Sequence, residues 1–493
     1  MRRAVQVDGG DAVATLLEDA HAGDLVAVGE RVLTARADVP RGHKIAVEPV
    51  PAGAAVTKFG FPIGTATDTI APGDHVHVHN VGTALAGTLD YRYAPSPIEK
   101  RSTPAPATFL GYRRADGRVG TRNEIWVLPT VGCVGRTAQR IAAAAHDAHR
   151  GEVDGVYAFT HPHGCSQLGD DLGGTRGILA ALANHPNAGG VLIVGLGCEE
   201  NQLHEVLAEL PPERRPYIRT LTAQSAGDEL EEGAALVAEL VAQAAAAKRE
   251  PVGLDALVLG VKCGGSDGFS GLTANPLVGR LSNRIAEAGG RVVLTEIPEV
   301  FGAEQLLMNR AADPQVFERI VGLVNGFKRY FLDHNQPVSE NPSPGNVAGG
   351  ITTLEEKSLG AVQKGGTAPV VDVLPYGGQV RGAGLTLLEA PGNDAVSSTA
   401  LAAAGATVIL FTTGRGTPMG FPVPTVKIAS NSDLAARKAG WIDFDAGRVL
   451  EDGFEAAEDA LLTRVLQISG GEPSAAERNG EREIAIWKRG VTL

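Results

Sequence analysis

The chain is poor in cysteine and aromatic residues and has no long apolar run. Its 493 residues include 4 Cys, 13 Phe, 7 Tyr and 3 Trp. So few cysteines exclude a disulfide framework, and no apolar segment reaches the roughly 18 residues that a membrane span needs. The nearest, 236–247, is interrupted by Glu239 and Gln243, and the N-terminus has no apolar signal core. We therefore expect a cytoplasmic protein with reduced thiols and no membrane partner.

Basic residues are also in deficit. The chain has 44 Lys and Arg against 57 Asp and Glu, a net charge of −13. Phosphate contacts need a basic surface, so we expect no nucleic-acid partner. The phosphate-binding P-loop motif is absent, and the segment GRGTPMG at 414–420 has Met419 where the dinucleotide fingerprint requires its third glycine. These absences disfavour a nucleotide cofactor.

Glycine, in contrast, is abundant. The chain has 63 glycines, well above the ordinary share of about 7%. A hydrophobic content of 43% and the lack of a G-x-y period exclude disorder and a collagen-like repeat. The glycines therefore belong in turns and in places where the backbone closely approaches another backbone or a ligand.

The local pattern changes along the chain. Short alternating segments separated by Pro and Gly turns predict an all-β region at the N-terminus, and a segment rich in Pro and Ser follows it. Strand-length apolar runs then alternate with helical segments, which predicts α/β units with mainly parallel sheets. The predicted organisation is a β domain at 1–95, a linker at 96–110, a middle α/β domain at 111–250 and a C-terminal α/β domain at 251–493.

The most unusual local motif is the run DHVHVHN at 74–80. In a strand, His75, His77 and His79 would share one face. Three imidazoles on one face can bind a metal or transfer protons. The alternative interpretation is a solvated strand face that happens to be rich in histidine.

Cysteines and glycines occur together after the predicted strands. Cys133, Cys198 and Cys263 each follow an apolar run and precede a predicted helix, and Glu296 ends another such run. In open α/β sheets, ligands bind at the carboxyl edge of the strands, and a thiol near a helix N-terminus has a lowered pKa. A further loop, THPHGCSQ at 160–167, carries two His and one Cys. The alternative is that the thiols are structural and the loop histidines merely exposed.

Long segments of the chain resemble one known family, the altronate/galactarate dehydratases. The segments are PRGHKIA (40–46), HVHVHN (75–80), DGRVGTRN (116–123), THPHGCSQLGDD (160–171), GLGCEENQ (195–202), KCGGSDGFSGLTANP (262–276), TEIPEVFGAEQLLMNRA (295–311), NPSPGNVAGGITTLEEKSLGAVQKGG (341–366), APGNDAVSSTALAAAGAT (390–407), FTTGRGTPMGFPVPTVKIASN (411–431) and WKRGVTL (487–493).

The resemblance implies a fold and a reaction. It implies an N-terminal SAF-type β domain joined to a two-part α/β catalytic body. It also implies metal-dependent dehydration of a sugar acid, D-altronate, to 2-dehydro-3-deoxy-D-gluconate and water. Length and the single-chain arrangement favour the altronate branch over the galactarate branch or another hydroxy-acid lyase of the family. A sulfolactate-cleaving relative divides the small domain and the body between two chains, which are fused here. The alternative of a different class is a non-catalytic protein that binds sugar acids or metals.

The resemblance and the motifs together give a set of candidate site residues. Elimination of water needs a Lewis acid and groups that transfer protons, and imidazole, carboxylate and thiolate suit Fe²⁺, with Mn²⁺ as an alternative. An iron–sulfur cluster on the three strand-end cysteines is a further alternative. We also expect a small sugar-acid substrate and a possible homo-oligomer. The candidates are His77, His79 and Glu304 for catalysis, Lys262, Ser266, Asp267 and Arg415 for substrate binding, and His77, His79, Cys198, Cys263 and Glu296 for the metal.

Overall fold

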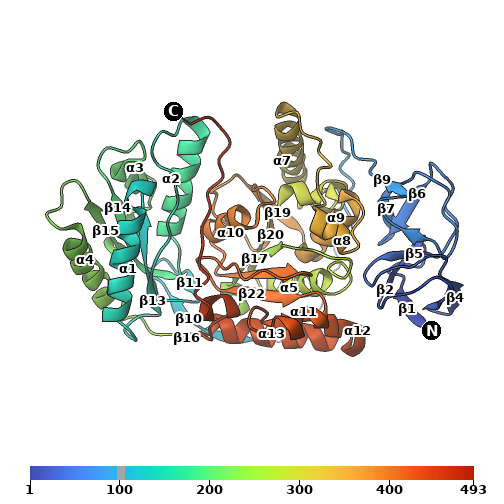
Figure 1. Ribbon diagram of the computed structural model, residues 1–493. Helices are drawn as coiled ribbons and strands as arrows, with labels where there is room; N and C mark the ends of the chain where they lie inside the picture. The colour runs from blue at the N-terminus through green and yellow to red at the C-terminus, as the bar shows by residue number, and fades with distance from the viewer. Residues whose placement is uncertain (97–105, 493) are drawn as a thin grey trace.

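The computed structural model describes residues 1–96 and 106–492, which form three bodies in a row (Figure 1). The N-terminal β domain lies at one end, the middle domain at the other, and the C-terminal domain between them. The predicted fold class is confirmed: the first part is all-β, and the body is built on parallel sheets. None of the described helices is long and apolar enough to cross a membrane.

The N-terminal β domain contains two sheets. One sheet has the strand order β4-β3-β1-β2-β5-β8 and the other β6-β7-β9. Apolar side chains such as Leu16, Val26 and Ile45 fill its core. The strands are β1 (Arg2–Val5), β2 (Val13–Leu16), β3 (Leu25–Val28), β4 (Arg31–Thr34), β5 (Lys44–Ala46), β6 (Ala55–Lys58), β7 (Phe61–Ala66), β8 (His75–Val76) and β9 (Val81–Gly82).

The middle domain is a four-stranded parallel sheet, β13-β12-β14-β15, with helices on both faces. Its central strands β12 and β14 are buried along their whole length, as a sheet covered on both faces requires. The elements are β12 (Glu124–Pro129), α1 (Gly135–Ala148), β13 (Gly155–Ala158), α2 (Gly169–Ala183), β14 (Ala188–Gly195), α3 (Leu203–Ala208), β15 (Ile218–Thr222) and α4 (Glu229–Ala244).

The C-terminal domain is a seven-stranded parallel sheet in the order β19-β20-β18-β17-β21-β22-β23. Its elements are β17 (Val258–Cys263), α5 (Ala274–Glu287), β18 (Arg291–Leu294), α6 (Glu304–Met308), α7 (Pro314–Asp333), α8 (Pro344–Ala348), α9 (Leu354–Ala361), β19 (Val370–Leu374), β20 (Gly384–Leu388), α10 (Asp394–Ala403), β21 (Val408–Thr413), β22 (Thr425–Ala429), α11 (Ser432–Arg437), β23 (Phe444–Asp445), α12 (Val449–Asp452), α13 (Phe454–Ser469) and α14 (Ala475–Arg478).

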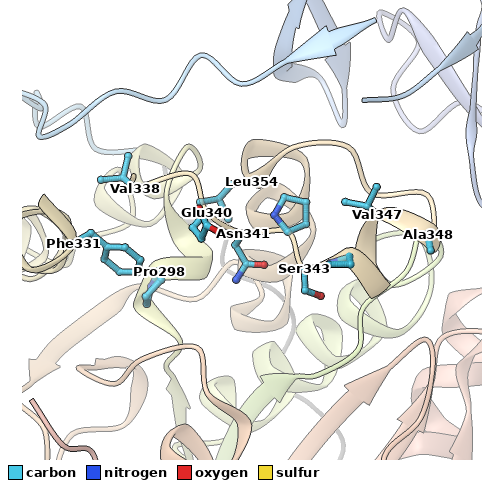
Figure 2. A pocket seen from close by; sticks show the side chains of 11 residues that line it. Pro298, Phe331, Val338, Glu340, Asn341, Ser343, Val347, Ala348 and Leu354 are labelled. Carbon is cyan, nitrogen blue, oxygen red and sulfur yellow. The ribbon is translucent and has the colours of Figure 1, made fainter. Parts of the chain in front are cut away.

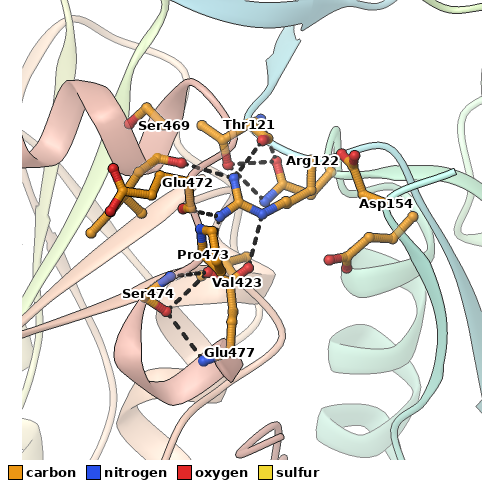
Figure 3. A network of polar contacts seen from close by, with 12 residues as sticks. Thr121, Arg122, Asp154, Val423, Ser469, Glu472, Pro473, Ser474 and Glu477 are labelled. Carbon is orange, nitrogen blue, oxygen red and sulfur yellow. Dashed lines mark hydrogen bonds and ion pairs between the residues drawn. The ribbon is translucent and has the colours of Figure 1, made fainter. Parts of the chain in front are cut away.

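A small antiparallel sheet and one buried arginine join the middle domain to the C-terminal domain. The sheet is β11-β10-β16, from β10 (Thr108–Arg113), β11 (Val119–Gly120) and β16 (Glu250–Gly253). Beside it, the Arg122 guanidinium donates to the carbonyl oxygens of Ile468 and Glu472 and pairs with the Glu477 carboxylate at 2.8 Å (Figure 3). Such a buried charge is tolerated because every donor has a partner.

The predicted linker at 96–110 falls mostly on residues 97–105, which lie outside the described residues. Its last residues, 108–110, belong to β10. The strand predicted through the histidine run is shorter than expected, because β8 ends at Val76. Asn80 closes a turn there: its side chain accepts from the amide of His77 and donates to the carbonyl of His75.

Three buried charges dock the N-terminal β domain onto the C-terminal domain. The Glu356 carboxylate on α9 accepts from Lys44 of β5 and from Lys58 of β6, each at 2.8 Å. Burial by itself would raise the pKa of Glu356, but attraction from the two lysines lowers it to about 2. The carboxylate is therefore ionised, and it joins β5 and β6 of the β domain to α9 of the body.

The buried histidine at the seam of the two α/β domains predicts how stability depends on pH. The Nδ1 atom of His185 accepts from the amide of Asn187, and its Nε2 donates to the carbonyl of Ala406. Burial lowers the pKa of His185 to about 3. In the unfolded chain the histidine pKa is about 6.5, so below this pH His185 is protonated in the unfolded chain while it stays neutral in the folded chain. The free energy of unfolding therefore falls as the pH drops from about 6.5 towards about 3, by up to about 1.4 kcal/mol per pH unit from this residue.

We expect His185→Gln to be less stable than the parent near pH 7 and to lose less stability between about pH 6 and about pH 4. Urea unfolding at the two pH values measures this. His204→Gln, at an exposed histidine, is the control and should follow the parent. Equal losses in all three proteins would contradict the assignment.

Candidate active site

A cavity of about 800 Å³ opens in the C-terminal domain, and all of its lining residues lie between Pro298 and Leu354. Figure 2 shows Pro298 and Phe331 at one end of it and Val347 and Ala348 at the other. Two clusters of reactive side chains contact its lining. The carbonyl of Ala348 accepts from the His43 ring, and the side chain of Asn341 accepts from Lys357. The lining residues are Pro298, Phe331, Val338, Glu340, Asn341, Pro342, Ser343, Pro344, Val347, Ala348 and Leu354.

The first group is the histidine cluster, formed by His43, His75, His77 and His79. The Nδ1 atom of His43 lies 3.1 Å from the Nε2 atom of His75. The rings of His75 and His77 are stacked with their centroids 5.5 Å apart, and the exposed His79 ring lies 5.2 Å from His75. His43 joins the group because β5 pairs antiparallel with β8, with Ile45 opposite His75. The predicted gathering of three histidine rings is therefore present, and His43, which sequence reasoning missed as a site residue, completes it.

The histidine cluster meets the body at one point. The Nδ1 atom of His77 lies 3.2 Å from the hydroxyl of Thr352, a residue two positions before the start of α9. Burial lowers the pKa of His75 to about 3, helped by the neighbouring imidazoles, and that of His77 to about 4, helped by the charge of Lys44. Burial also lowers the pKa of His43. The inner rings are therefore neutral at pH 7 and keep a free lone pair.

The second group is the Cys263 cluster, formed by Cys263, Glu296, Glu299 and three lysines. The thiol of Cys263, at the end of β17, donates to Glu299 at 3.4 Å, and its backbone amide donates to Glu296 at 2.9 Å. The ammonium of Lys364 donates to the Cys263 sulfur at 2.8 Å. The two other ammonium groups pair with the carboxylates, Lys262 with Glu296 at 3.1 Å and Lys357 with Glu299 at 2.8 Å.

Both clusters bring potential metal ligands together. The ligand atoms of His43, His75 and His77 lie within 4.8 Å of one another, and so do those of Cys263, Glu296 and Glu299. The donor chemistry differs. Three neutral imidazoles are a common ligand set for a divalent metal. At the Cys263 cluster, ammonium groups already balance the carboxylates, and burial raises the thiol pKa to about 12, which keeps the proton on sulfur. The histidine cluster is therefore the better fit for a metal ion.

The backbone at Glu296 is unusual. This residue has φ +65°, in the left-handed region that residues with a side chain seldom adopt. The conformation directs its buried carboxylate to the backbone amide of Cys263 and to Lys262, whose ammonium also donates to Asp394 at 2.6 Å. Burial opposes the ammonium charge of Lys262, but Glu296 and Asp394 raise its pKa. Strain of this kind is maintained at functional sites.

The structure places the predicted substrate-binding residues differently. Asp267 is buried, and its oxygens accept from Ser270, Ser430 and Asn431, which gives it a role in holding its own loop. Burial raises its pKa. Ser266 is also buried, and its carbonyl accepts from Asn346.

Arg415, the fourth predicted substrate-binding residue, is exposed. It donates to the carbonyl of Gly345 on α8 at 3.4 Å, beside the cavity lining. Arg415 is therefore free to reach a ligand that enters the cavity.

Two further candidates lie outside both clusters. Glu304 is buried and accepts from Lys328 at 2.6 Å and from the hydroxyl of Tyr91 at 2.5 Å, so it joins α6 to α7 and to the segment after the β domain. Cys198 is exposed in the middle domain, where its sulfur accepts from Gln224. The predicted sharing of one sheet edge by Cys133, Cys198 and Cys263 is wrong, because β17 belongs to a different sheet from β12 and β14.

Sequence reasoning also missed Glu299, Lys357, Lys364 and Asn341. Glu299 follows Glu296 by three residues, about one helical turn, and this spacing could have indicated that the two carboxylates lie close together. The two lysines carry no such signal, because a buried lysine that pairs with a residue distant in the chain looks the same in the sequence as a surface lysine.

Family models match almost the whole chain. The model described as "Altronate/galactarate dehydratase SAF domain" matches residues 2–84, and "D-galactarate dehydratase/Altronate hydrolase, second domain" matches 111–245. The model "D-galactarate/Altronate dehydratase, C-terminal" matches 254–492, which contains the cavity and the Cys263 cluster.

Several characterised proteins are similar over their full length. The chain is 49% identical to altronate dehydratase of Escherichia coli (strain K12), over 98% of each chain. It is 46% identical to altronate dehydratase of Bacillus subtilis (strain 168), over 100% of each. The galactarate dehydratase (L-threo-forming) of Escherichia coli is 31% identical, over 88% of this chain and 86% of the relative. The chain therefore belongs to the altronate/galactarate dehydratase family.

Proposed function

We propose that the protein is a hydro-lyase that converts D-altronate to 2-dehydro-3-deoxy-D-gluconate and water. The observation that carries this proposal is the similarity to two altronate dehydratases along the whole chain, stronger than that to the galactarate enzyme. The cavity supports it, because its lining residues Ala348 and Asn341 are hydrogen-bonded to an imidazole, that of His43, and to an ammonium group, that of Lys357.

The reaction removes the proton on the carbon beside the carboxylate and the hydroxyl group on the next carbon. The enol that results becomes the 2-keto product. The site must hold the carboxylate, accept the first proton and donate one to the departing hydroxide. Neutral imidazoles suit the accepting role, and ammonium groups suit the donating and anchoring roles.

We assign the carboxylate of the substrate to the side of Lys357 and Arg415. Attraction from Glu299 raises the pKa of Lys357 against the effect of burial, so its ammonium is charged while it contacts the cavity residue Asn341. Arg415 adds a second cation at the mouth of the cavity. His79, the exposed member of the histidine cluster, is the proposed proton carrier, because its ring is free to meet solvent and substrate.

We propose that His43, His75 and His77 hold Fe²⁺, with Mn²⁺ as the alternative metal. When bound, such an ion supplies a Lewis acid that stabilises negative charge on substrate oxygens. The protein's part is to keep the three rings neutral and in place, which burial and the contact of His77 with Thr352 accomplish. All four cysteines are free, which supports a reducing, cytoplasmic location for the enzyme.

A substrate panel tests the reaction. With Fe²⁺ supplied under anaerobic conditions, we expect a 2-keto-3-deoxy acid to form from D-altronate and to form more slowly from galactarate. Preference for galactarate would move the protein to the neighbouring branch. Binding of both acids without turnover of either would support the non-catalytic alternative.

The assignment of Arg415 predicts a substrate-binding defect. An exposed guanidinium that binds a carboxylate contributes about 1.5–3 kcal/mol, so we expect Arg415→Met to raise KM for altronate by about 10-fold or more and to change kcat little. Arg437→Met, at another exposed arginine of the same domain, is the matched control. A KM that is unchanged in Arg415→Met would remove this residue from the site.

Substitutions in the two clusters should have different effects on metal binding. Because the imidazole of His77 is a proposed ligand, we expect His77→Gln to bind Fe²⁺ more than 10-fold more weakly and to lose turnover. Cys263→Ser should bind Fe²⁺ as the parent does. Thr352→Val removes the hydroxyl partner of His77 but leaves the imidazole, and it controls for loosened docking. Weakened binding in Cys263→Ser alone would place the metal at the Cys263 cluster.

A further inference from the structure

The three remaining cysteines lie together on the middle domain. Cys133 follows β12, Cys165 follows β13 and Cys198 follows β14, and these strands are neighbours in one parallel sheet, in the order β13-β12-β14. All three thiols are exposed and free. Parallel strands deliver their carboxyl ends to one edge, so three thiols meet at the edge where open α/β sheets bind ligands. Cys263, the fourth, is buried in the other sheet.

The thiol loops, residues 130–135, 160–168 and 196–202, are bonded to one another. The amide of Gly132, next to Cys133, donates to the carbonyl of His163 at 2.8 Å. The amide of Ser166, next to Cys165, donates to the Glu200 carboxylate at 2.8 Å. The amide of Asn201 donates to the carbonyl of Gly164 at 3.1 Å. Each of the three thiol loops is therefore hydrogen-bonded to a neighbouring thiol loop, next to Cys133 and Cys165 and three residues after Cys198.

The loop that carries Cys165 is pressed closely against the loop that carries Cys133. Gly164 has φ +103°, and a Cβ atom at this position would lie 2.2 Å from the carbonyl oxygen of Thr130. On the other side of Cys165, Ser166 has φ +55° although it bears a side chain. A position that excludes a Cβ atom on one side of Cys165, and a residue with a side chain in the left-handed region on the other, fix the backbone on both sides of this exposed thiol.

The thiol loops lead into helices and contain polar atoms without partners. Helices α1 and α2 begin at Gly135 and Gly169, shortly after Cys133 and Cys165. Two buried side chains of the thiol loops, Gln167 and Asn201, each keep one polar atom without a hydrogen-bond partner among the described residues. Such atoms point to a missing partner at this edge.

The spacing of the thiols separates two kinds of metal site. Three thiolates on one ion, each about 2.3 Å from the metal, lie about 4 Å from one another. Within residues 1–96 and 106–492, the sulfur atoms of Cys133, Cys165 and Cys198 do not form a group whose members all lie within 4.8 Å. A cluster spreads its thiolates further apart, because each of them binds a different iron atom.

We propose that Cys133, Cys165 and Cys198 bind a four-iron, four-sulfide cluster through three thiolates. The fourth iron has no cysteine and is open to an oxygen ligand. Each thiol gives up its proton to solvent as its sulfur binds iron. The site lies in the middle domain, at the other end of the molecule from the histidine cluster (Figure 1). The cluster is thus a second iron site, and the inference does not depend on which sugar acid the enzyme dehydrates.

Anaerobic reconstitution of the full chain with equal amounts of Fe²⁺ and Fe³⁺ and with sulfide tests this, since the brown cluster contains two ferrous and two ferric ions. We expect a brown protein with about four acid-labile sulfide per chain, and with about four iron in addition to the iron of the histidine cluster. Cys133→Ser, Cys165→Ser and Cys198→Ser should each lose most of the sulfide and the visible absorbance. Cys263→Ser, which changes the only other thiol, should retain both. Far-ultraviolet circular dichroism shows that each variant is folded, as exposed Cys-to-Ser changes should allow.

Iron at the histidine cluster is distinguished by its lack of sulfide and by its loss in His77→Gln. A parent protein that takes up no sulfide would overturn the proposal, and so would zinc or iron bound by the three thiols without sulfide. A Cys165→Ser variant that keeps the full sulfide content would overturn it as well. None of these results bears on altronate turnover, which the substrate panel measures separately.

Discussion

The arrangement of the candidate active site depends on one buried carboxylate. Glu356 holds Lys44 and Lys58 of the N-terminal β domain at 2.8 Å each, and the same docking brings His77 to Thr352 and His43 to Ala348. Removing one partner from a buried ion pair costs about 3–5 kcal/mol, because the remaining charges have no water to solvate them. Loss of any one of the three charges would therefore disturb the docking, which further hydrogen bonds, those of Thr83 and Ala84 with Glu355, support.

The two reactive clusters use burial in opposite ways. In the histidine cluster, burial removes positive charge and leaves neutral nitrogen lone pairs. In the Cys263 cluster, three ammonium groups and two carboxylates compensate one another, and the thiol keeps its proton. The histidine cluster can therefore accept protons or a metal ion, whereas the Cys263 cluster offers a charged hydrogen-bond donor, Lys357, next to the cavity residue Asn341. A hydroxy acid, which has a carboxylate at one end and an acidic C–H bond beside it, matches this division.

Much of the fold could be predicted from the sequence, because short runs of Val, Leu and Ile indicate strands that are buried on both faces of a sheet. The sequence did not predict to which of the sheets each strand belongs. Cys133 and Cys263 both follow such runs, yet β12 and β17 lie in different sheets, since sheet membership depends on long-range packing. The histidine rings were predicted on one face of a strand. They meet instead through a turn closed by Asn80 and through His43 of a paired strand. Contacts between residues distant in the chain leave no periodic pattern in the sequence. For the same reason, Lys357 and Lys364 were not predicted as site residues.

The docking carboxylate also bears on the order in which the chain is made. Lys44 and Lys58 are synthesised about 300 residues before Glu356, their separations in the chain being 312 and 298 residues. Among the described residues, the hydrogen-bond partners of both ammonium groups are the Gly350 carbonyl and the Glu356 carboxylate, which belong to the C-terminal domain. During synthesis, therefore, the β domain has to fold with these two charges in water. The two lysines are buried only in the later docking step. Until Glu356 has been synthesised, the N-terminal domain therefore exposes two charges without their carboxylate partner.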